Sequence, residues 1–322
     1  MKRLLSIVIT AAMAATSPLH AQVNLGVNNA GLSIGNSPEW RGVRLNFRDQ
    51  AVREVYGVNI TIWQPHQPSS GDYHGIMIGL PSTGGEQLSG MGVGLLGLAA
   101  SKDMRGVMIG GVGAGAGGDI TGLGAGLIGL GAGGDITGVS FAGVGVGAGG
   151  DITGIAIGGV GLAAGGDITG IQLAMFGMGA GEDIRGIGIA GFGIGAGGDI
   201  SGIHLAGFGM GAGGEIRGGN LALFGLGANS IRGVAVASLL QSGEFSGLGI
   251  APAHLRIQNG GRFTGVGLSA YHEVRGHTKG LTIGLLNYTR TLYGVQLGVI
   301  NVVGENPRGR RMLPVVNWNF KD

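Results

Sequence analysis

A parallel β-solenoid with about 16 residues per coil is the fold that this sequence predicts, and three observations favour it. Glycine supplies 76 of the 322 residues, whereas roughly 7% is usual. An acidic residue followed by isoleucine returns every sixteen positions through the middle of the chain. The same period continues more loosely on both sides. Repeats of this length indicate stacked units that cannot bury their apolar side alone.

The composition excludes several other classes of protein. Charged residues make up only 12% and hydrophobic residues 44%, so the chain lacks the polar, charged character of a disordered tail. Glycine does not recur at every third position, as collagen requires. No cysteine is present, which excludes disulfide frameworks, thiol catalysis and cysteine-ligated zinc.

Residues 1–21 read as a secretory signal peptide. Lys2 and Arg3 precede an apolar run, and a cleavage site follows Ala21. Without this segment, Lys+Arg falls from 20 to 18 and equals the 18 Asp+Glu, so no nucleic-acid partner is expected. We therefore expect an exported protein at the cell surface or outer membrane of a Gram-negative-type bacterium, with the periplasm as a further location.

Residues 22–322 are predicted to form a single repeat domain. It comprises divergent N-terminal units (23–102), regular 16-residue repeats (103–232) and divergent C-terminal units with a cap (233–322). Each unit carries a glycine followed by an apolar–any–apolar triplet. These glycines are Gly42, Gly57, Gly75, Gly90, Gly106, Gly122, Gly138, Gly154, Gly170, Gly186, Gly202, Gly218, Gly233, Gly247, Gly265, Gly280 and Gly294.

The ends of the domain differ most from the regular repeats. An open stack of strands exposes an edge at each end, and such edges need protection. Residues 23–60 and 276–322 are therefore the predicted caps.

Each regular unit is expected to hold two short strands. In the unit 136–151, the apolar positions slip by one residue after Phe141, which in a straight strand would move them to the other face. A corner near Ala142–Gly143 would keep all of them inside, and the GAGGD turn would close the unit. In the unit that follows Gly170, this predicts that Ile171, Leu173, Phe176 and Met178 point inward and that Gln172 faces water.

An outer-membrane antiparallel β-barrel with one strand per repeat is the alternative fold. Sixteen residues can hold a membrane-spanning strand and a turn, and the chain ends in the alternating segment VVNWNF. Against it stand the slip in apolar positions, the uniformly short turns, and the absence of Trp and Tyr from the repeats between Gly106 and Gly218. The solenoid is therefore preferred.

Two C-terminal segments carry a resemblance to a known family. Gly280–Asn287 and Gly294–Asn301 read G-apolar-x-apolar-G-apolar-apolar-Asn and resemble the bacterial surface-repeat proteins. The central units depart from this pattern, with glycine in place of the asparagine at Gly145 and Gly161. The resemblance implies an exported, envelope-associated protein of uncharacterised activity and supplies no catalytic residues.

No catalytic, cofactor-binding or metal site is predicted, and the chain is not expected to be an enzyme. His272, Glu273 and His277 approach the HExxH motif, but the second histidine comes one residue too late for two ligands on one helical turn. Arg308, together with Arg310 and Arg311, is interpreted as part of a solvated turn.

One column of acidic residues leaves two interpretations open. In a solenoid it would stack carboxylates about 5 Å apart, with mutual repulsion that raises their pKa values. Calcium could bridge them, although one carboxylate per coil is few for that ion. Otherwise each carboxylate accepts backbone N–H groups at a turn. The column consists of Asp119, Asp135, Asp151, Asp167, Asp183, Asp199 and Glu215.

The function expected from these features is structural. We expect a cell-envelope or surface interaction protein without catalytic activity, whose partners are envelope or outer-membrane components or an extracellular ligand. The alternative is an outer-membrane protein with an anchoring or transport role. Cofactors are not expected, apart from the calcium considered above.

Overall fold

The computed structural model describes residues 22–63 and 71–320, and nearly all of their regular structure is β-strand. The predicted signal peptide, residues 1–21, lies outside the described residues. The chain divides into two compact units, Met1–Gly118 and Asp119–Asp322.

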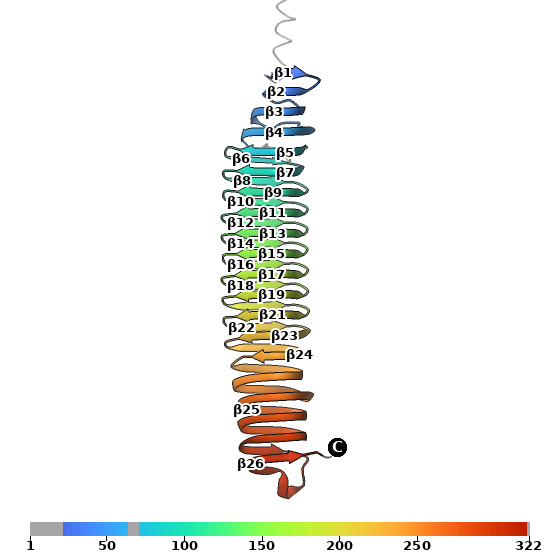
Figure 1. The fold of residues 1–322 in the computed structure, drawn as a ribbon, viewed down its shortest axis with the longest axis vertical. Helices are drawn as coiled ribbons and strands as arrows, with labels where there is room; N and C mark the ends of the chain where they lie inside the picture. Colours follow the sequence, from blue (N-terminus) through green and yellow to red (C-terminus); the bar gives the residue numbers. More distant parts are fainter. Residues whose placement is uncertain (1–21, 64–70, 321–322) are drawn as a thin grey trace, which may run out of the picture. The chain divides into compact units, whose positions relative to one another are not determined.

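The first unit begins with an antiparallel pair, β1 and β2, and continues as parallel coils (Figure 1). From β5 onward the strands separate into two stacks, in which β5, β7 and β9 pair in one and β6, β8 and β10 in the other. The strands are β1 (Val23–Val27), β2 (Ala30–Ile34), β3 (Glu39–Arg48), β4 (Glu54–Trp63), β5 (Asp72–Gly79), β6 (Ser82–Gly85), β7 (Gln87–Gly94), β8 (Gly97–Ala100), β9 (Met104–Gly110) and β10 (Gly113–Ala116).

The second unit alternates long and short strands before they merge into a continuous spiral. The long strands are β11 (Ile120–Gly126), β13 (Ile136–Ala142), β15 (Ile152–Gly158), β17 (Ile168–Ala174), β19 (Ile184–Ala190), β21 (Ile200–Ala206) and β23 (Glu215–Ala222). The short strands are β12 (Gly129–Ala132), β14 (Gly145–Ala148), β16 (Gly161–Ala164), β18 (Gly177–Ala180), β20 (Gly193–Ala196) and β22 (Gly209–Ala212). β24 (Gly225–Val236), β25 (Leu239–Val303), the 3-10 helix η1 (Arg308–Arg310) and β26 (Met312–Asn319) follow.

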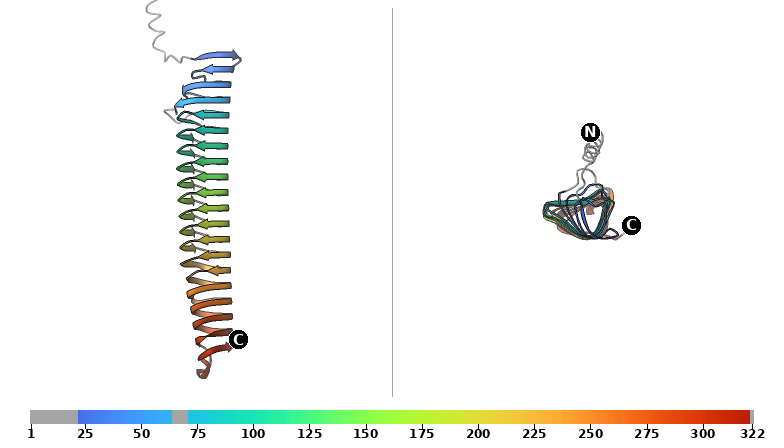
Figure 2. Two further views of the ribbon diagram at one scale, coloured as in Figure 1. Left: turned by 60° about the vertical axis from the view of Figure 1, so that its left-hand side comes forward. Right: turned by 90° about the horizontal axis from the view of Figure 1, so that it is seen from above.

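Parallel pairing in a constant register confirms the solenoid. Ile136 pairs with Ile152 and Thr137 with Thr153, so each residue meets the one sixteen positions later. The left view of Figure 2 shows these strands stacked one coil per step within each unit. The predicted bend and closing turn are also present, at residues 143–144 and 149–151. The antiparallel alternative, with one strand per repeat, is wrong.

The repeat glycines mark a second corner that the sequence prediction did not place. All seventeen have positive φ, between 106° and 147°, a region that L side chains rarely adopt. At Gly154 a Cβ atom would lie only 2.1 Å from the carbonyl oxygen of Gly138 in the coil beside it. Glycine therefore recurs at this position because the backbone of one coil rests directly on the next.

The predicted side-chain directions on the long strands are wrong. Gln172 is only 1% exposed, whereas Ile171 and Leu173 beside it are 52% and 43% exposed. Phe176 also faces outward, and of the four side chains predicted inside only Met178 is buried.

The width of the coil explains this reversal. The interior of a regular unit is filled by one isoleucine at the start of the long strand, small residues such as Ser140 and Ala142, and the apolar residue and alanine of the short strand, such as Val146 and Ala148. A Cβ added at Gly124, which occupies the same column as Ser140, would already lie 2.8 Å from Leu130. The two walls approach so closely that most coils carry a small residue in this column, although Gln172 and His204 are also buried there.

Cysteine labelling can check this reversal, because the chain has no cysteine of its own. We expect cysteine at Leu173 to react rapidly with a polar maleimide and cysteine at Gln172 to react at least tenfold more slowly, because position 172 is buried. Mass spectrometry of timed reactions measures both rates. The opposite order would restore the inward-facing arrangement of the apolar residues.

Both predicted caps carry antiparallel strands and buried polar networks, and their role as caps stays a prediction. In the first unit the buried pair Arg44 and Asp49 shares hydrogen bonds with Asn59. At the other end, β26 pairs antiparallel with β25. The two asparagines of the surface-repeat pattern are buried and linked, because Asn287 Nδ2 donates to Asn301 Oδ1 at 2.8 Å.

Candidate functional site

An apolar face is the largest functional candidate of the second unit. It consists of the outward side chains of the long strands together with those at the bend that follows. On the strands these are Leu123, Val139, Phe141, Ile155, Ile171, Leu173, Ile187, Ile189, Ile203 and Leu205, and at the bends Ile128, Val144, Val160, Phe176, Phe192, Phe208 and Phe224. The face continues on β25 with Val266, Leu268, Ile283 and Leu297.

Four phenylalanines form a ridge along this face. Phe176, Phe192, Phe208 and Phe224 stack with ring centroids 4.8 to 5.0 Å apart and nearly parallel planes. Each is 46 to 59% exposed. An aromatic side chain covers 150–250 Å², so the ridge alone presents roughly 400 Å² of apolar surface. That already matches the largest patch on an ordinary monomer, about 300–600 Å².

The short strands carry a contrasting glycine face. Their outward positions hold glycine with one alanine, as at Gly145 and Gly147, while the alternate residues are buried. Cβ atoms added at Gly179 or Gly195 would meet nothing within 4 Å. This face is therefore open space bounded by backbone, and it tolerates added side chains.

The acidic column forms a hydrogen-bonded ladder rather than a row of repelling charges. Each carboxylate accepts the backbone N–H of the acidic residue in the next coil, as in Asp151 N–H to Asp135 Oδ1 at 2.8 Å. Six such bonds of 2.6 to 2.9 Å run from Asp119 to Glu215. The turn-forming interpretation is therefore confirmed in a modified form, because the bonds link neighbouring coils instead of closing one turn.

The expected rise in pKa is reversed at Asp167. The backbone N–H of Asp183 and then the guanidinium of Arg185 lower the pKa of the Asp167 carboxyl. Arg185 also pairs with Asp183, so one cation bridges two coils. Hydrogen bonds to the charged form favour ionisation. The Asp167 carboxylate thus stabilises the fold at neutral pH, and this contribution disappears as acidification protonates it.

Substitution at Asp151 tests the ladder. We expect Asp151→Ala to lower the free energy of unfolding by about 1–2 kcal/mol, because the N–H of Asp167 loses its acceptor. Asp151→Asn keeps an acceptor oxygen and is expected to cost less than half as much. Urea denaturation followed by circular dichroism measures both values. Equal losses would show that charge, and not hydrogen bonding, sets the contribution.

Calcium binding by this column stays a separate prediction. No group of three or more His, Cys, Asp or Glu side chains that could hold a metal ion occurs in residues 22–63 and 71–320. The Oδ1 atoms from Asp119 to Asp199 already accept N–H groups, whereas calcium takes six to eight oxygen ligands. We expect melting curves in millimolar calcium and in chelator to superimpose. A calcium-dependent rise that Asp151→Asn abolishes would establish the site.

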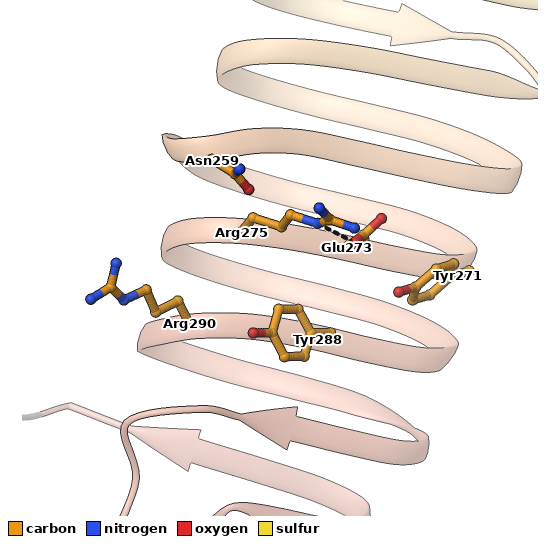
Figure 3. A pocket seen from close by; sticks show the side chains of 6 residues that line it. All are labelled: Asn259, Tyr271, Glu273, Arg275, Tyr288 and Arg290. Atoms are coloured by element: carbon orange, nitrogen blue, oxygen red, sulfur yellow. Dashed lines mark hydrogen bonds and ion pairs between the residues drawn. The ribbon is translucent and has the colours of Figure 1, made fainter.

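A shallow polar hollow of about 450 Å³ lies on β25 (Figure 3). It is lined by Asn259, Tyr271, Glu273, Arg275, Tyr288 and Arg290. Figure 3 shows these side chains projecting from neighbouring coils of the spiral.

Glu273 is the centre of this polar cluster. Its carboxylate, only 9% exposed, lies 2.6 Å from Arg275 Nε, 3.3 Å from His254 Nε2 and 3.8 Å from Arg256 Nε. The His254 ring stacks on Tyr271 with centroids 4.7 Å apart. Partial burial, and next the charge of Glu273, raise the pKa of Tyr271, so its hydroxyl stays protonated. One carboxylate thus neutralises part of a basic surface.

The HExxH-like residues do not converge. His272 is fully buried, with its ring edge-on to Phe263 at 4.8 Å, whereas His277 is exposed beside Thr291. The basic cluster that begins at Arg308 lies on η1 and the residue after it, all exposed, which confirms a solvated turn.

Charge separation along the second unit is the feature that sequence reasoning missed. Residues 119–215 contain eight acidic residues and one basic, a net charge of −7. Residues 216–320 contain ten basic residues and three acidic, a net charge of +7. The overall charge near zero conceals this division, which a separate count for regular and divergent repeats would have revealed.

No helix in residues 22–63 and 71–320 is both long and apolar enough to span a membrane.

Comparisons of the chain with family models, with curated proteins and with solved structures gave no match. What the chain is therefore follows from its architecture: it is a β-solenoid repeat protein with coils of about 16 residues.

Proposed function

We propose that this chain is an exported structural or interaction protein of the bacterial cell envelope, without catalytic activity. The single observation that carries the proposal is the apolar face, which is larger than the patches that soluble monomers ordinarily expose and is of the kind that marks interaction sites. The signal-like residues 1–21 and the resemblance of Gly280–Asn287 and Gly294–Asn301 to bacterial surface-repeat proteins support export.

The arrangement of side chains favours display over chemistry. Each exposed position of the repeat carries the same kind of side chain in successive coils. Such repetition suits a long, uniform contact surface. The polar hollow on β25 has its carboxylate, Glu273, paired with Arg275 and Arg256, and no nucleophile–base pair stands out among the residues that line it. The described side chains are therefore better suited to an interaction surface than to a catalytic site.

Cell fractionation with matched variants tests this proposal. We expect the tagged chain to separate with the envelope, and Phe192→Glu with Phe208→Glu to move most of it into a soluble fraction. Gly195→Glu with Gly211→Glu adds the same charge to the glycine face of the same coils, where a Cβ has room, and is expected to change nothing. A chain found in the cytoplasm, or equal release of both variants, would contradict the proposal.

A further inference from the structure

We propose that the apolar face of the second unit binds a second copy of this chain in antiparallel orientation. This inference rests on the proposed function and names the partner. The four half-exposed phenylalanines present roughly 400 Å², and the aliphatic columns beside them bring the apolar area to the order of 800 Å². A stable dimer buries about 800 Å² on each partner.

The repeat spacing of the face favours a copy of itself. Side chains stand in columns one coil apart, about 4.8 Å, as the stacked phenylalanines show with centroid separations of 4.8 to 5.0 Å. A second solenoid presents the same spacing, so ridges of one copy interdigitate with grooves of the other along the whole face. Two packed sheets bury their inner side chains in this manner.

Charge along one edge of the face selects the orientation. This edge is the acidic column, which lies three residues before each repeat glycine. Towards the end of the chain the same register position holds Glu244, Arg262 and His277, and Lys279 follows immediately before Gly280. All four side chains are exposed. The edge therefore changes from uniformly acidic to mixed charge that includes Arg262 and Lys279.

A two-fold axis can join two identical faces in two ways. If the axis runs along the stack, the copies are parallel and each charged edge meets the opposite, glycine-bordered edge. If the axis crosses the stack, the copies are antiparallel and charged edge meets charged edge with the ends exchanged. Only the second arrangement places residues 119–215 (−7) against residues 216–320 (+7) of the partner copy.

The same charges disfavour a lipid surface as the occupant. Residues 119–215 contain a single basic residue, Arg185, which is already paired with Asp167 and Asp183. An anionic membrane attracts clusters of lysine and arginine, so it would repel this half of the face. A complementary second copy satisfies both halves.

Analytical ultracentrifugation of the full chain measures the association. We expect a concentration-dependent dimer whose dissociation constant rises about tenfold between 50 and 500 mM salt, because screening weakens the edge contacts. Phe192→Glu with Phe208→Glu is expected to raise the dissociation constant at least ~100-fold. The glycine-face control, Gly195→Glu with Gly211→Glu, should leave it within twofold.

Spin labels on the cysteine-free chain determine the orientation. Thr137 and Ser201 occupy the same register position four coils apart. In an antiparallel dimer with its axis near Arg217, labels at Thr137 lie roughly 40 Å further apart than labels at Ser201. In a parallel dimer the two distances are equal. Pulsed electron paramagnetic resonance distinguishes the two cases.

The remaining outcomes separate the inference from the proposed function. Equal label distances would overturn the antiparallel inference and leave the interaction role intact. A monomer that floats with vesicles of phosphatidylcholine, or of phosphatidylcholine with phosphatidylglycerol, would replace the second copy by a lipid surface. A monomer at 100 μM (roughly the top of the range for a weak dimer) that ignores both vesicles would overturn the inference and remove the main support for the proposed function.

Discussion

Lowering the pH from 7 to 4 is expected to reduce the free energy of unfolding of the C-terminal coils by about 3 kcal/mol. The cause is His272, which is fully buried. Within the described residues neither of its ring nitrogens has a hydrogen-bond partner. Burial, and next the charge of His254, lower the pKa of His272 to about 3.

The sign follows from proton binding in the two states. The unfolded imidazole takes up a proton below about pH 6.5, whereas the folded one stays neutral down to about pH 3. Between these values the unfolded state binds more protons, so stability falls as the pH falls. The full contribution of the neutral His272 to the free energy of unfolding is present above about pH 6.5. The Asp167 carboxylate responds in the same direction but at lower pH, because its pKa is lowered in the folded state.

Urea denaturation at several pH values, with hydrogen exchange to locate the loss, measures this effect. His272→Leu is expected to remove most of the slope between pH 6.5 and 4. His204 is expected to account for the slope that is left, because burial also lowers the pKa of that imidazole. The matched control is His277→Leu, at an exposed histidine, which should keep the full slope. A slope that survives His272→Leu unchanged would contradict the assignment.

Gly154→Val is expected to disrupt the regular repeats more than any substitution of an exposed residue. The Cβ would lie 2.1 Å from the Gly138 carbonyl oxygen, and φ at this position is 117°. Backbone strain of this kind costs on the order of 1–3 kcal/mol, and the clash with a neighbouring coil adds to it. We expect a loss of at least ~3 kcal/mol, concentrated in the coils on either side.

A glycine in the preceding coil supplies the control for this substitution. At Gly145 the nearest atom to an added Cβ is 3.6 Å away, an ordinary contact, and the position faces outward. Gly145→Val should therefore change the free energy of unfolding by less than 1 kcal/mol. Thermal melts and hydrogen exchange compare the two variants. Similar losses at both sites would show that glycine content matters generally, and that the corner geometry has no special role.

The coil was predictable from the sequence because its period appears in every unit. The sixteen-residue return of the acidic residue set the register that the strand pairs adopt. The slip after Phe141 placed the bend at residues 143–144. Such signals survive in a single sequence because identical units stack upon each other and share one geometry.

Side-chain direction was not predictable by the rule that apolar residues face inward. Because side chains alternate along a strand, either face of the strand can point inward. The rule selects the face that carries Ile171 and Leu173. The coil selects the other, because a narrow interior accepts Gly124 and Ser140 with little space to spare. One buried imidazole, His204, adjoins Gly188, where an added Cβ would lie 2.7 Å from the ring. The sequence thus pairs a large buried side chain with a glycine in the neighbouring coil, but only the pairing register of the coils reveals this.

The candidate site escaped the sequence for the same reason. Once the long strands present their large residues outward, the apolar face and the phenylalanine ridge follow directly. The opposite charges of the two halves were visible in the sequence. They acquired meaning only when the structure placed Asp151 and Arg262 at the same register position of coils in opposite halves of the unit.

The constant register of stacking has a consequence for how such a gene can change. Each residue of a regular coil rests on its counterpart in the next, as Ile136 does on Ile152. Loss or duplication of one whole coil by slippage during replication therefore rejoins surfaces that already fit. Within the regular coils, an insertion or deletion of any other length shifts the residues that follow it away from their counterparts, whereas the divergent coils keep their glycines stacked at spacings of 14 to 18 residues. Populations carrying this gene should differ in length by whole coils, so the number of turns becomes a heritable variable that changes while the fold is conserved.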